Sequence, residues 1–451
     1  FTQIELGKDG KIYFATNNRL ATLSNPNTPN PANWVNSAVP VSYYQTLDYA
    51  GPSPVSSYTL PDQIDGMDYT SHFFANIQCC ITNTFFNAQT FTAPANATWT
   101  PGTTTNPFAS TSGIVLIEKE LIIPAGKTVT IQNMTFKFAP GAKVVVERGT
   151  GALAGGKLIL NNTTFTVDDR CNPNAMWLGV QVYGHVNQNQ TPYSTSQQAW
   201  FIMNNGSVVE HALKGAVAVK INSQPNYPFN FTSYDFNYTG GIIQATNSYF
   251  KNNRQDVEFR RYIAPNNVNN QSRFTNCEFT TNGLLNNPVY YPVYHVFMHD
   301  VVGIGFYGND FKNLTPNLYN YSQRGWGIYS VDAHYFVNAR CLSMTFPCNS
   351  FDPNVFQDLY FGIRALAGPL RTVKADRNKF INNFFGAYLG GPDFATFTRN
   401  DFEVFRSATP NPVTQTYGMY LNACHGYKVE ENTFTEYNDP NASAPGNTYG
   451  V

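Results

Sequence analysis

The sequence has little charge for its length. Asp, Glu, Lys and Arg make up 13% of the 451 residues, about half the ~25% that is usual for soluble domains. The formal net charge is −1, and no run of Lys or Arg exceeds two residues. Phosphate binding needs a dense basic patch, so we expect neither nucleic acid nor an anionic membrane surface as a partner.

Long apolar runs and metal-type cysteine motifs are also missing. No uninterrupted run of about 18 apolar residues occurs, so the sequence predicts no membrane-spanning helix. No Cys-x-x-Cys motif occurs, which argues against a zinc ribbon or a redox site. The seven cysteines are an odd number, so at least one has no partner within the chain. Cys341 and Cys348 flank a six-residue loop, which leaves two alternatives: a small disulfide or two buried thiols.

Aromatic and uncharged polar residues take the place of charge. Aromatic residues reach 15%, with 35 Phe and 28 Tyr, and hydrophobic residues reach 42%. A chain of this length can bury a large core and has room for two or three domains. A surface of Asn, Thr, Ser and Tyr suits an extracellular β-protein, so we expect a secreted or cell-surface location. The chain begins at Phe1 without a secretory apolar segment, so we expect it to be processed or to be part of a longer polypeptide.

Short β-branched runs separated by turn residues fill the stretch 121–182. The runs are divided by Pro-Ala-Gly, Pro-Gly-Ala and Gly-Gly turns. Phe136 and Phe165 end two similar phrases 29 residues apart. A strand cluster that repeats at about this period indicates a coil that stacks on copies of itself.

Phenylalanine recurs through the rest of the chain as a candidate anchor of each coil. The candidate anchors are Phe136, Phe165, Phe250, Phe279, Phe311, Phe351, Phe380, Phe402 and Phe434. Val208 would take this place inside the 85-residue gap between Phe165 and Phe250. A glycine precedes several anchors, at Gly327, Gly362, Gly386 and Gly418.

Asparagine stands two residues before the anchor in five consecutive candidate coils. These residues are Asn309, Asn349, Asn378, Asn400 and Asn432. Positions i and i+2 of a strand share a face, and stacked strands lie ~4.8 Å apart, so the asparagines would form one file beside the phenylalanines. An antiparallel sandwich has no reason to repeat Asn-x-Phe at this period, whereas a right-handed parallel β-helix does.

The sequence divides into three regions. Residues 1–75 contain three short antiparallel strands, about one propeller blade, and we expect the rest of a propeller to lie upstream. Residues 76–110 end in Thr-, Asn- and Pro-rich sequence and are predicted to be a linker or cap. Residues 111–451 are predicted to form the β-helix. The fold class is therefore all-β, with an antiparallel N-terminal segment.

Several phrases resemble a known family. Met176–Gly184, which reads Met-Trp-Leu-Gly-Val-Gln-Val-Tyr-Gly, resembles the right-handed, pectate-lyase-like β-helix of large surface proteins secreted by Bacteroidota. Leu6–Tyr13 and Asn25–Asn27 look like the last propeller blade found upstream in such proteins. The resemblance implies export by the type IX secretion machinery, although the sorting domain usual in the family is not seen before Val451.

Two carboxylates are the candidate catalytic residues. Glu278 and Asp310 stand just before their anchors in consecutive coils, so stacking would bring them about 5 Å apart. Such a pair suits a retaining glycosidase or a Ca²⁺ site, whereas the alternative is a solvated outward pair. Otherwise we expect no cofactor and no metal.

Four aromatic residues are the candidate ligand-binding residues. Tyr290, Tyr291, Tyr294 and Trp326 would stack on sugar rings along an exposed face. The alternative is stacking between coils. From these features we expect a structural or adhesive surface protein that binds glycans or surface proteins. The other hypotheses are a lyase or glycoside hydrolase acting on an acidic polysaccharide, and a cargo held by its secretion machinery.

Overall fold

The computed structural model describes four strands within residues 1–89, and residues 90–108, 111–169, 173–192, 195–222, 233–343, 347–368, 371–405, 415–437 and 447–451. The chain divides into two compact units, Phe1–Cys79 and Cys80–Val451. Within the described residues, no helix is long and apolar enough to cross a membrane.

The first unit contains a four-stranded antiparallel sheet in the order β1-β2-β3-β4. Its strands are β1 (Ile4–Leu6), β2 (Ile12–Thr16), β3 (Arg19–Leu23) and β4 (Trp34–Pro40). The first three strands were predicted from the sequence, whereas β4, which follows the Asn- and Pro-rich sequence of residues 24–33, was not. Membership of a propeller stays a prediction.

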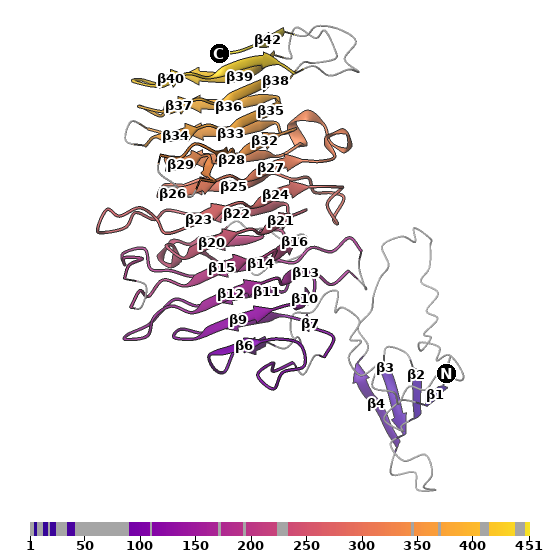
Figure 1. Ribbon diagram of the computed structural model, residues 1–451. Helices are drawn as coiled ribbons and strands as arrows, with labels where there is room; N and C mark the ends of the chain where they lie inside the picture. Colours follow the sequence, from indigo (N-terminus) through magenta and orange to yellow (C-terminus); the bar gives the residue numbers. More distant parts are fainter. Residues whose placement is uncertain are drawn as a thin grey trace, which may run out of the picture. The chain divides into compact units, whose positions relative to one another are not determined.

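The second unit is a parallel β-helix, which confirms the predicted fold class. Each coil adds one strand to each of three parallel sheets, so strands of successive coils lie above one another (Figure 1). We number the sheets in the order in which the chain enters them.

Sheet 1 has twelve strands: β5 (Thr90–Thr92), β8 (Glu120–Ile123), β11 (Lys143–Val146), β14 (Gly179–Val182), β17 (Ala216–Ala218), β22 (Gln255–Phe259), β25 (Tyr294–His299), β28 (Trp326–Val331), β33 (Phe361–Leu366), β36 (Phe385–Gly390), β39 (Gln415–Asn422) and β42 (Asn447–Tyr449). Sheet 2 has eleven: β6 (Ala97–Trp99), β9 (Thr128–Gln132), β12 (Lys157–Asn161), β15 (Trp200–Asn204), β20 (Ile242–Thr246), β23 (Arg273–Thr275), β26 (Val302–Tyr307), β29 (His334–Asn338), β34 (Val373–Asp376), β37 (Thr396–Thr398) and β40 (Lys428–Glu430). Sheet 3 has eleven: β7 (Ile114–Ile117), β10 (Thr135–Phe138), β13 (Thr164–Val167), β16 (Val208–Glu210), β21 (Tyr249–Lys251), β24 (Glu278–Thr281), β27 (Asp310–Asn313), β32 (Val355–Gln357), β35 (Lys379–Asn383), β38 (Asp401–Val404) and β41 (Thr433–Glu436).

In the described part of the second unit, two hairpins and three short 3-10 helices interrupt this repeat. They are β18 (Lys220–Ile221) with β19 (Tyr234–Asp235), β30 (Arg340–Cys341) with β31 (Phe351–Asp352), η2 (Phe236–Tyr238), η3 (Pro316–Leu318) and η4 (Tyr321–Gln323). Parallel stacking already begins at β5, which pairs with β8, and at β6, which pairs with β9. The stacked region therefore starts inside the segment 76–110, which the sequence analysis assigned to a linker or cap.

A file of phenylalanine rings fills the interior behind sheet 3. Phe380 lies between Phe356 and Phe402, with ring centroids 4.9 and 4.5 Å away and nearly parallel planes. The spacing equals the ~4.8 Å between stacked strands, so each coil adds one ring. In the early coil without an anchor phenylalanine, Val209 pairs with Phe165 and is buried. The prediction of Val208 at this place was therefore wrong by one residue.

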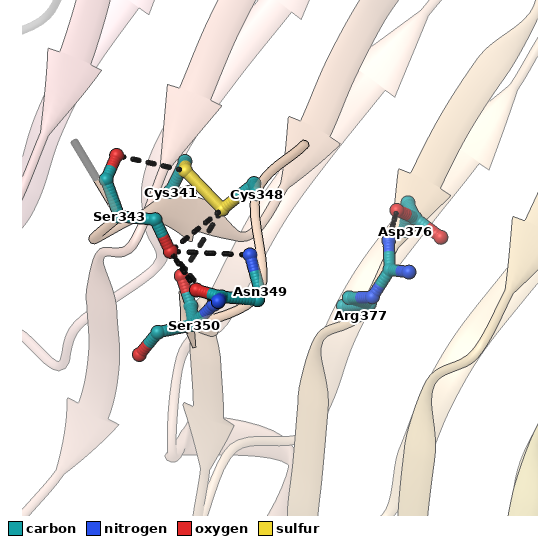
Figure 2. The surroundings of a disulfide bond; sticks show 7 residues. All are labelled: Cys341, Ser343, Cys348, Asn349, Ser350, Asp376 and Arg377. Carbon is teal, nitrogen blue, oxygen red and sulfur yellow. Dashed lines mark hydrogen bonds and ion pairs between the residues drawn. A yellow bond between two sulfur atoms is a disulfide. The ribbon is translucent and has the colours of Figure 1, made fainter. Parts of the chain in front are cut away.

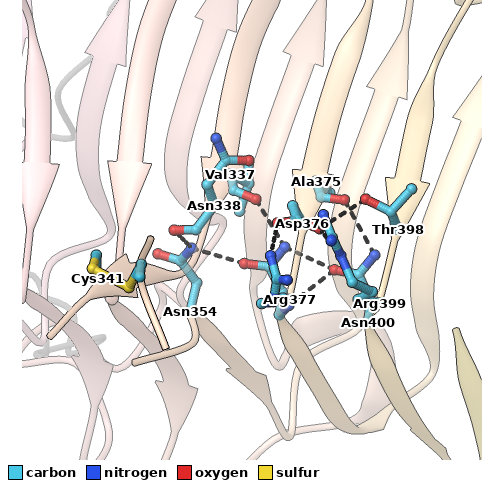
Figure 3. A network of polar contacts seen from close by, with 12 residues as sticks. Val337, Asn338, Cys341, Asn354, Ala375, Asp376, Arg377, Thr398, Arg399 and Asn400 are labelled. Atoms are coloured by element: carbon cyan, nitrogen blue, oxygen red, sulfur yellow. Dashed lines mark hydrogen bonds and ion pairs between the residues drawn. A yellow bond between two sulfur atoms is a disulfide. The ribbon is translucent and has the colours of Figure 1, made fainter. Parts of the chain in front are cut away.

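A hydrogen-bonded file of asparagines lies beside the rings. The file runs in the order Asn309, Asn354, Asn378, Asn400 and Asn432, and the side-chain Nδ2 of each of the first four donates to the Oδ1 of the next at 2.8–2.9 Å. Figure 3 shows part of this file, with Asn354 and Asn400 labelled. Four of the five predicted asparagines lie in this file. The prediction of Asn349 with anchor Phe351 was wrong, because the β30–β31 hairpin shifts the phase and places Asn354 and Phe356 there instead.

The displaced residues belong to the hairpin that carries the disulfide. The sulfur atoms of Cys341 and Cys348 are bonded, with Cα atoms 6.0 Å apart (Figure 2). Asn349 is exposed and its backbone N–H donates to the Ser343 hydroxyl at 3.1 Å. The ring of Phe351 lies 4.2 Å below the guanidinium of Arg377. The hairpin is therefore an outward insertion and adds nothing to the interior files.

Candidate functional site

Aromatic side chains gather on the outer face of sheet 1 in its later coils. We call these residues the aromatic stripe: Tyr294, Phe297, Trp326, Tyr329, Phe361, Phe385, Tyr388, Tyr417, Tyr420 and Tyr449, with Arg364 among them. Register sets them in two columns. One column contains Trp326, Phe361 and Phe385 at paired positions, and the other runs three residues further along each strand.

A recurring four-residue phrase aims these rings outward. It reads aromatic, glycine, aliphatic, then aromatic or arginine, as in Phe385-Gly386-Ala387-Tyr388. Ala387 is fully buried, whereas Phe385 and Tyr388 are half-buried on the other face. A Cβ on Gly386 would lie 2.5 Å from the Gly418 carbonyl oxygen and 2.8 Å from Cδ1 of Phe402. Only glycine fits there, since the interior phenylalanine file runs directly beneath.

From Phe361 onward, most of the stripe rings stack on one another along the coil axis. The Phe385 ring is 4.8 Å from Phe361 and 5.4 Å from Tyr417, with planes within 15°. Tyr388 and Tyr420 stack likewise at 5.1 Å. Their ring faces are covered by neighbouring rings, so this part of the stripe offers ring edges and tyrosine hydroxyls to a ligand.

Trp326 breaks the stack. Its plane is turned 78° from that of Phe361 and 81° from that of Tyr329, with centroids 5.2 and 4.8 Å away. The Arg364 guanidinium lies 4.8 Å from the Trp326 centroid and 5.7 Å from that of Tyr388. Nε of Arg364 is buried without a hydrogen-bond partner among the described residues. The stripe thus combines aromatic surface with one cation.

The stripe begins where a buried ion cluster and a hairpin cover sheet 1. Glu258 is fully buried and accepts hydrogen bonds from Lys214 and Arg260. Burial alone would raise the pKa of the Glu258 carboxyl, but the two cations hold that pKa below its ordinary value. The Arg260 guanidinium lies 4.4 Å from the ring of Tyr234 in β19 and 4.6 Å from that of Phe297. Arg260 therefore joins the covered coils to the beginning of the stripe.

The structure divides the four predicted ligand-binding aromatics. Tyr294 and Trp326 are register partners within the stripe. Tyr290 lies in the loop before β25, with the Arg254 guanidinium 4.6 Å from its ring. It packs against a separate buried cluster formed by Met176, Leu178, Leu213 and Leu285. Tyr291 is 40% exposed in the same loop.

The two predicted carboxylates are brought together on sheet 3. Glu278 and Asp310 are register partners on β24 and β27. With Asp352 they line a small pocket of about 140 Å³. Asp310 pairs with Lys312 at 2.9 Å and Asp352 pairs with Arg340 at 2.8 Å. In the described part of the chain, no group of three His, Cys, Asp or Glu residues is arranged to hold a metal ion.

A buried carboxylate–imidazole pair was not anticipated from the sequence. Nδ1 of His295 is 2.6 Å from Oδ2 of Asp256, and Nδ2 of Asn253 donates to Oδ1 at 2.8 Å. Burial raises the pKa of Asp256, against the opposing effect of these two hydrogen bonds. His295 occupies the place that glycine takes in later coils, between the rings of Phe279 and Phe311. A histidine at a position where later coils have glycine was the sequence feature that could have indicated this pair.

No protein-family model, no curated protein and no solved structure matches this chain. The geometry of the outer faces is therefore the basis for any functional conclusion.

Proposed function

We propose that the protein is a structural and adhesive β-helix of the cell surface whose aromatic stripe binds glycans. The single observation that carries this proposal is the outward file of aromatic residues on sheet 1, from Tyr294 to Tyr449. Phe297 and Phe361 are buried, whereas the other aromatic residues of the stripe keep part of their surface exposed. Contiguous exposed apolar surface is a mark of an interaction site. Tyrosine hydroxyls can donate to and accept from sugar hydroxyls, and the turned Trp326 ring departs from the stack.

The rigid stack suits such a role. Parallel coils keep outward side chains in register at a fixed spacing, which gives the extended surface that stacked repeats use for binding. The low charge of the chain and the resemblance to secreted surface β-helices of Bacteroidota favour a secreted or cell-surface location. Export through the type IX machinery is what the resemblance implies and is part of the same proposal, whereas a cargo held by its secretion machinery stays a separate hypothesis.

The test is glycan-array screening followed by calorimetric titration with the best-bound oligosaccharide. Trp326→Ala should weaken binding by up to about tenfold, the equivalent of one aromatic contact. Phe394→Ala is the matched control, because Phe394 is 67% exposed but lies outside the stripe. Failure to bind any glycan, together with normal cell attachment by a deletion strain, would refute the proposal.

A second candidate is a polysaccharide lyase or glycoside hydrolase. The observation that favours it is the direct register of Glu278 and Asp310 beside a pocket. Depolymerisation of an acidic polysaccharide that Glu278→Gln or Asp310→Asn abolishes, while unfolding midpoints stay unchanged, would establish this activity. Unaltered polymer length after prolonged incubation with the wild-type protein would exclude it for that substrate.

A further inference from the structure

A hollow lies on the outer face of sheet 2 beside a glycine. Along this face, Arg273, Gly305 and Phe336 are register partners on β23, β26 and β29. Gly305 lacks a side chain between the two larger residues, and it lines a pocket of about 320 Å³. This volume lies at the lower end of the range of ~300–1,000 Å³ for small-molecule sites.

Aromatic surface lines the hollow on two sides. The ring of Tyr307 lies over Gly305. A Cβ added to Gly305 would therefore lie 2.6 Å from Cε2 of that ring. Phe336 forms the wall on the next coil and is half-buried. Gly305 is thus needed both for the position of Tyr307 and for the space beside it.

A loop held by hydrogen bonds forms the rim. Backbone N–H of Gln271 donates to the Gln190 side-chain oxygen at 2.7 Å, and Nε2 of Gln244 donates to the Gln271 carbonyl at 2.7 Å. Backbone N–H of Ser272 donates to Oδ1 of Asn270 at 2.8 Å. Because these contacts fix the loop in place, a ligand would not need to order it.

The electrostatic character of the hollow is positive. Among the described residues that line it, Arg273 is the one charged side chain, and none is a carboxylate. The side chain of Arg273 is exposed. On the far side of Phe336, Lys374 is the next register partner, with Nζ 5.8 Å from the Phe336 ring. An anion would meet a cation at each end of this file.

We propose that this hollow binds one anionic sugar unit of a glycan, with its carboxylate or sulfate on Arg273. The planar guanidinium matches either oxyanion with two parallel hydrogen bonds. The ring of Phe336 or Tyr307 packs against the sugar ring, and the amides of the rim receive its hydroxyls. The site lies on a different sheet from the aromatic stripe and does not depend on glycan binding there.

The experiment is calorimetric titration of the full chain with three separate probes: an oligouronate, a sulfated oligosaccharide and a neutral oligosaccharide of equal length. The proposal expects one or both charged probes to bind, with affinity falling as salt rises, and the neutral probe to bind at least tenfold more weakly. The two charged probes distinguish carboxylate from sulfate as the natural group. Equal binding of all three probes, or of none, would overturn the proposal.

Variants locate the binding to the hollow. Arg273→Gln should lower the affinity for the charged probe about tenfold or more, since a hydrogen bond to a charged group is lost. Arg273→Lys should retain part of the affinity, because the charge stays and the paired geometry goes. Lys379→Gln removes the same charge from an exposed position on sheet 3 and should leave binding unchanged. An equal loss with Lys379→Gln would assign the effect to net charge and overturn the site.

Discussion

Two phenylalanines of one coil show how the same contact serves two purposes. Phe380 on β35 points inward and is 1% exposed, whereas Phe385 on β36 points outward and is half-buried. Each stacks between the rings of the coils before and after it, at 4.5–5.4 Å. The stacking geometry is therefore a consequence of coil register, and only the environment separates a core residue from a surface one.

The comparison teaches that aromatic periodicity alone does not identify a binding face. Inside, a ring removes its whole surface from water and is surrounded by neighbours, so its removal leaves a cavity. Outside, one side of the ring borders solvent, so its removal leaves a dent that water fills. In the outer phrase, the aliphatic residue between the two aromatic positions, such as Ala387, is buried, and this shows that the aromatic rings point outward.

The largest expected effect is the loss of an interior ring. Phe380→Ala should lower the free energy of unfolding by about 3–5 kcal/mol, through lost transfer energy and a residual cavity. Phe385→Ala should cost roughly 1 kcal/mol, because the ring is only partly removed from water. Urea unfolding of both variants measures the difference. Equal losses would mean that the two faces are not distinct.

A smaller effect is expected from filling a place where only glycine fits. Gly386→Ala should destabilise by about 1–3 kcal/mol, because its Cβ meets a carbonyl oxygen and a buried ring. Gly390→Ala in the same strand is the control. There the nearest atom is Cδ2 of Leu366 at 2.9 Å, at the end of a flexible side chain. Thermal unfolding of both variants measures the difference. A lower unfolding temperature for Gly390→Ala than for Gly386→Ala would contradict this account.

The asparagine file gives the next effect. Asn378→Ala removes its bonds to Asn400 and to the Val337 carbonyl and leaves a buried partner unsatisfied, which should cost about 1–3 kcal/mol. Asn349→Ala should change stability by less than about 0.5 kcal/mol, because surface substitutions usually have small effects. Chemical denaturation distinguishes them. A larger cost at Asn349 would contradict the observed phase of the file.

The last effect depends on pH and concerns the polar pair in the interior. The pKa of Asp256 is raised in the folded state, so its protonated carboxyl stabilises the fold. This stabilisation is fully present at a pH below about 3.9, the ordinary pKa of an aspartate, and is lost as the pH rises through the folded-state pKa. Asp256→Asn cannot titrate there, so the wild type should lose stability relative to this variant as pH rises from about 4. His295 is the titratable group that faces Asp256. Parallel stability curves from pH 4 to 7 would contradict the assignment.

The interior files were largely predictable from sequence, because a fixed period needs only local patterns. Asn378, Asn400 and Asn432 precede their phenylalanines by two residues, and strand geometry then places both on one face. The prediction failed at Asn349, where the hairpin inserts residues that resemble the repeat. The Asn-x-Phe pattern alone does not show whether a given occurrence lies in the core or in an inserted hairpin.

The outer faces were less predictable. Tyr294 and Trp326 were identified as candidates, but the stripe also contains residues such as Phe361 and Tyr420, whose direction depends on the glycine between the aromatic positions. The hollow beside Gly305 gave no sequence signal. Its walls, Arg273 and Phe336, stand 32 and 31 residues away in the chain.

The sequence by itself determined that coils of similar length stack in parallel, since the side chains that repeat at each period can be buried only against copies of themselves. The tertiary structure alone decided which side chains share a surface. Neighbours on an outer face come from different coils, and their alignment depends on every insertion between them. A pocket or a stripe on a β-helix is therefore a property of register, which no short stretch of sequence contains.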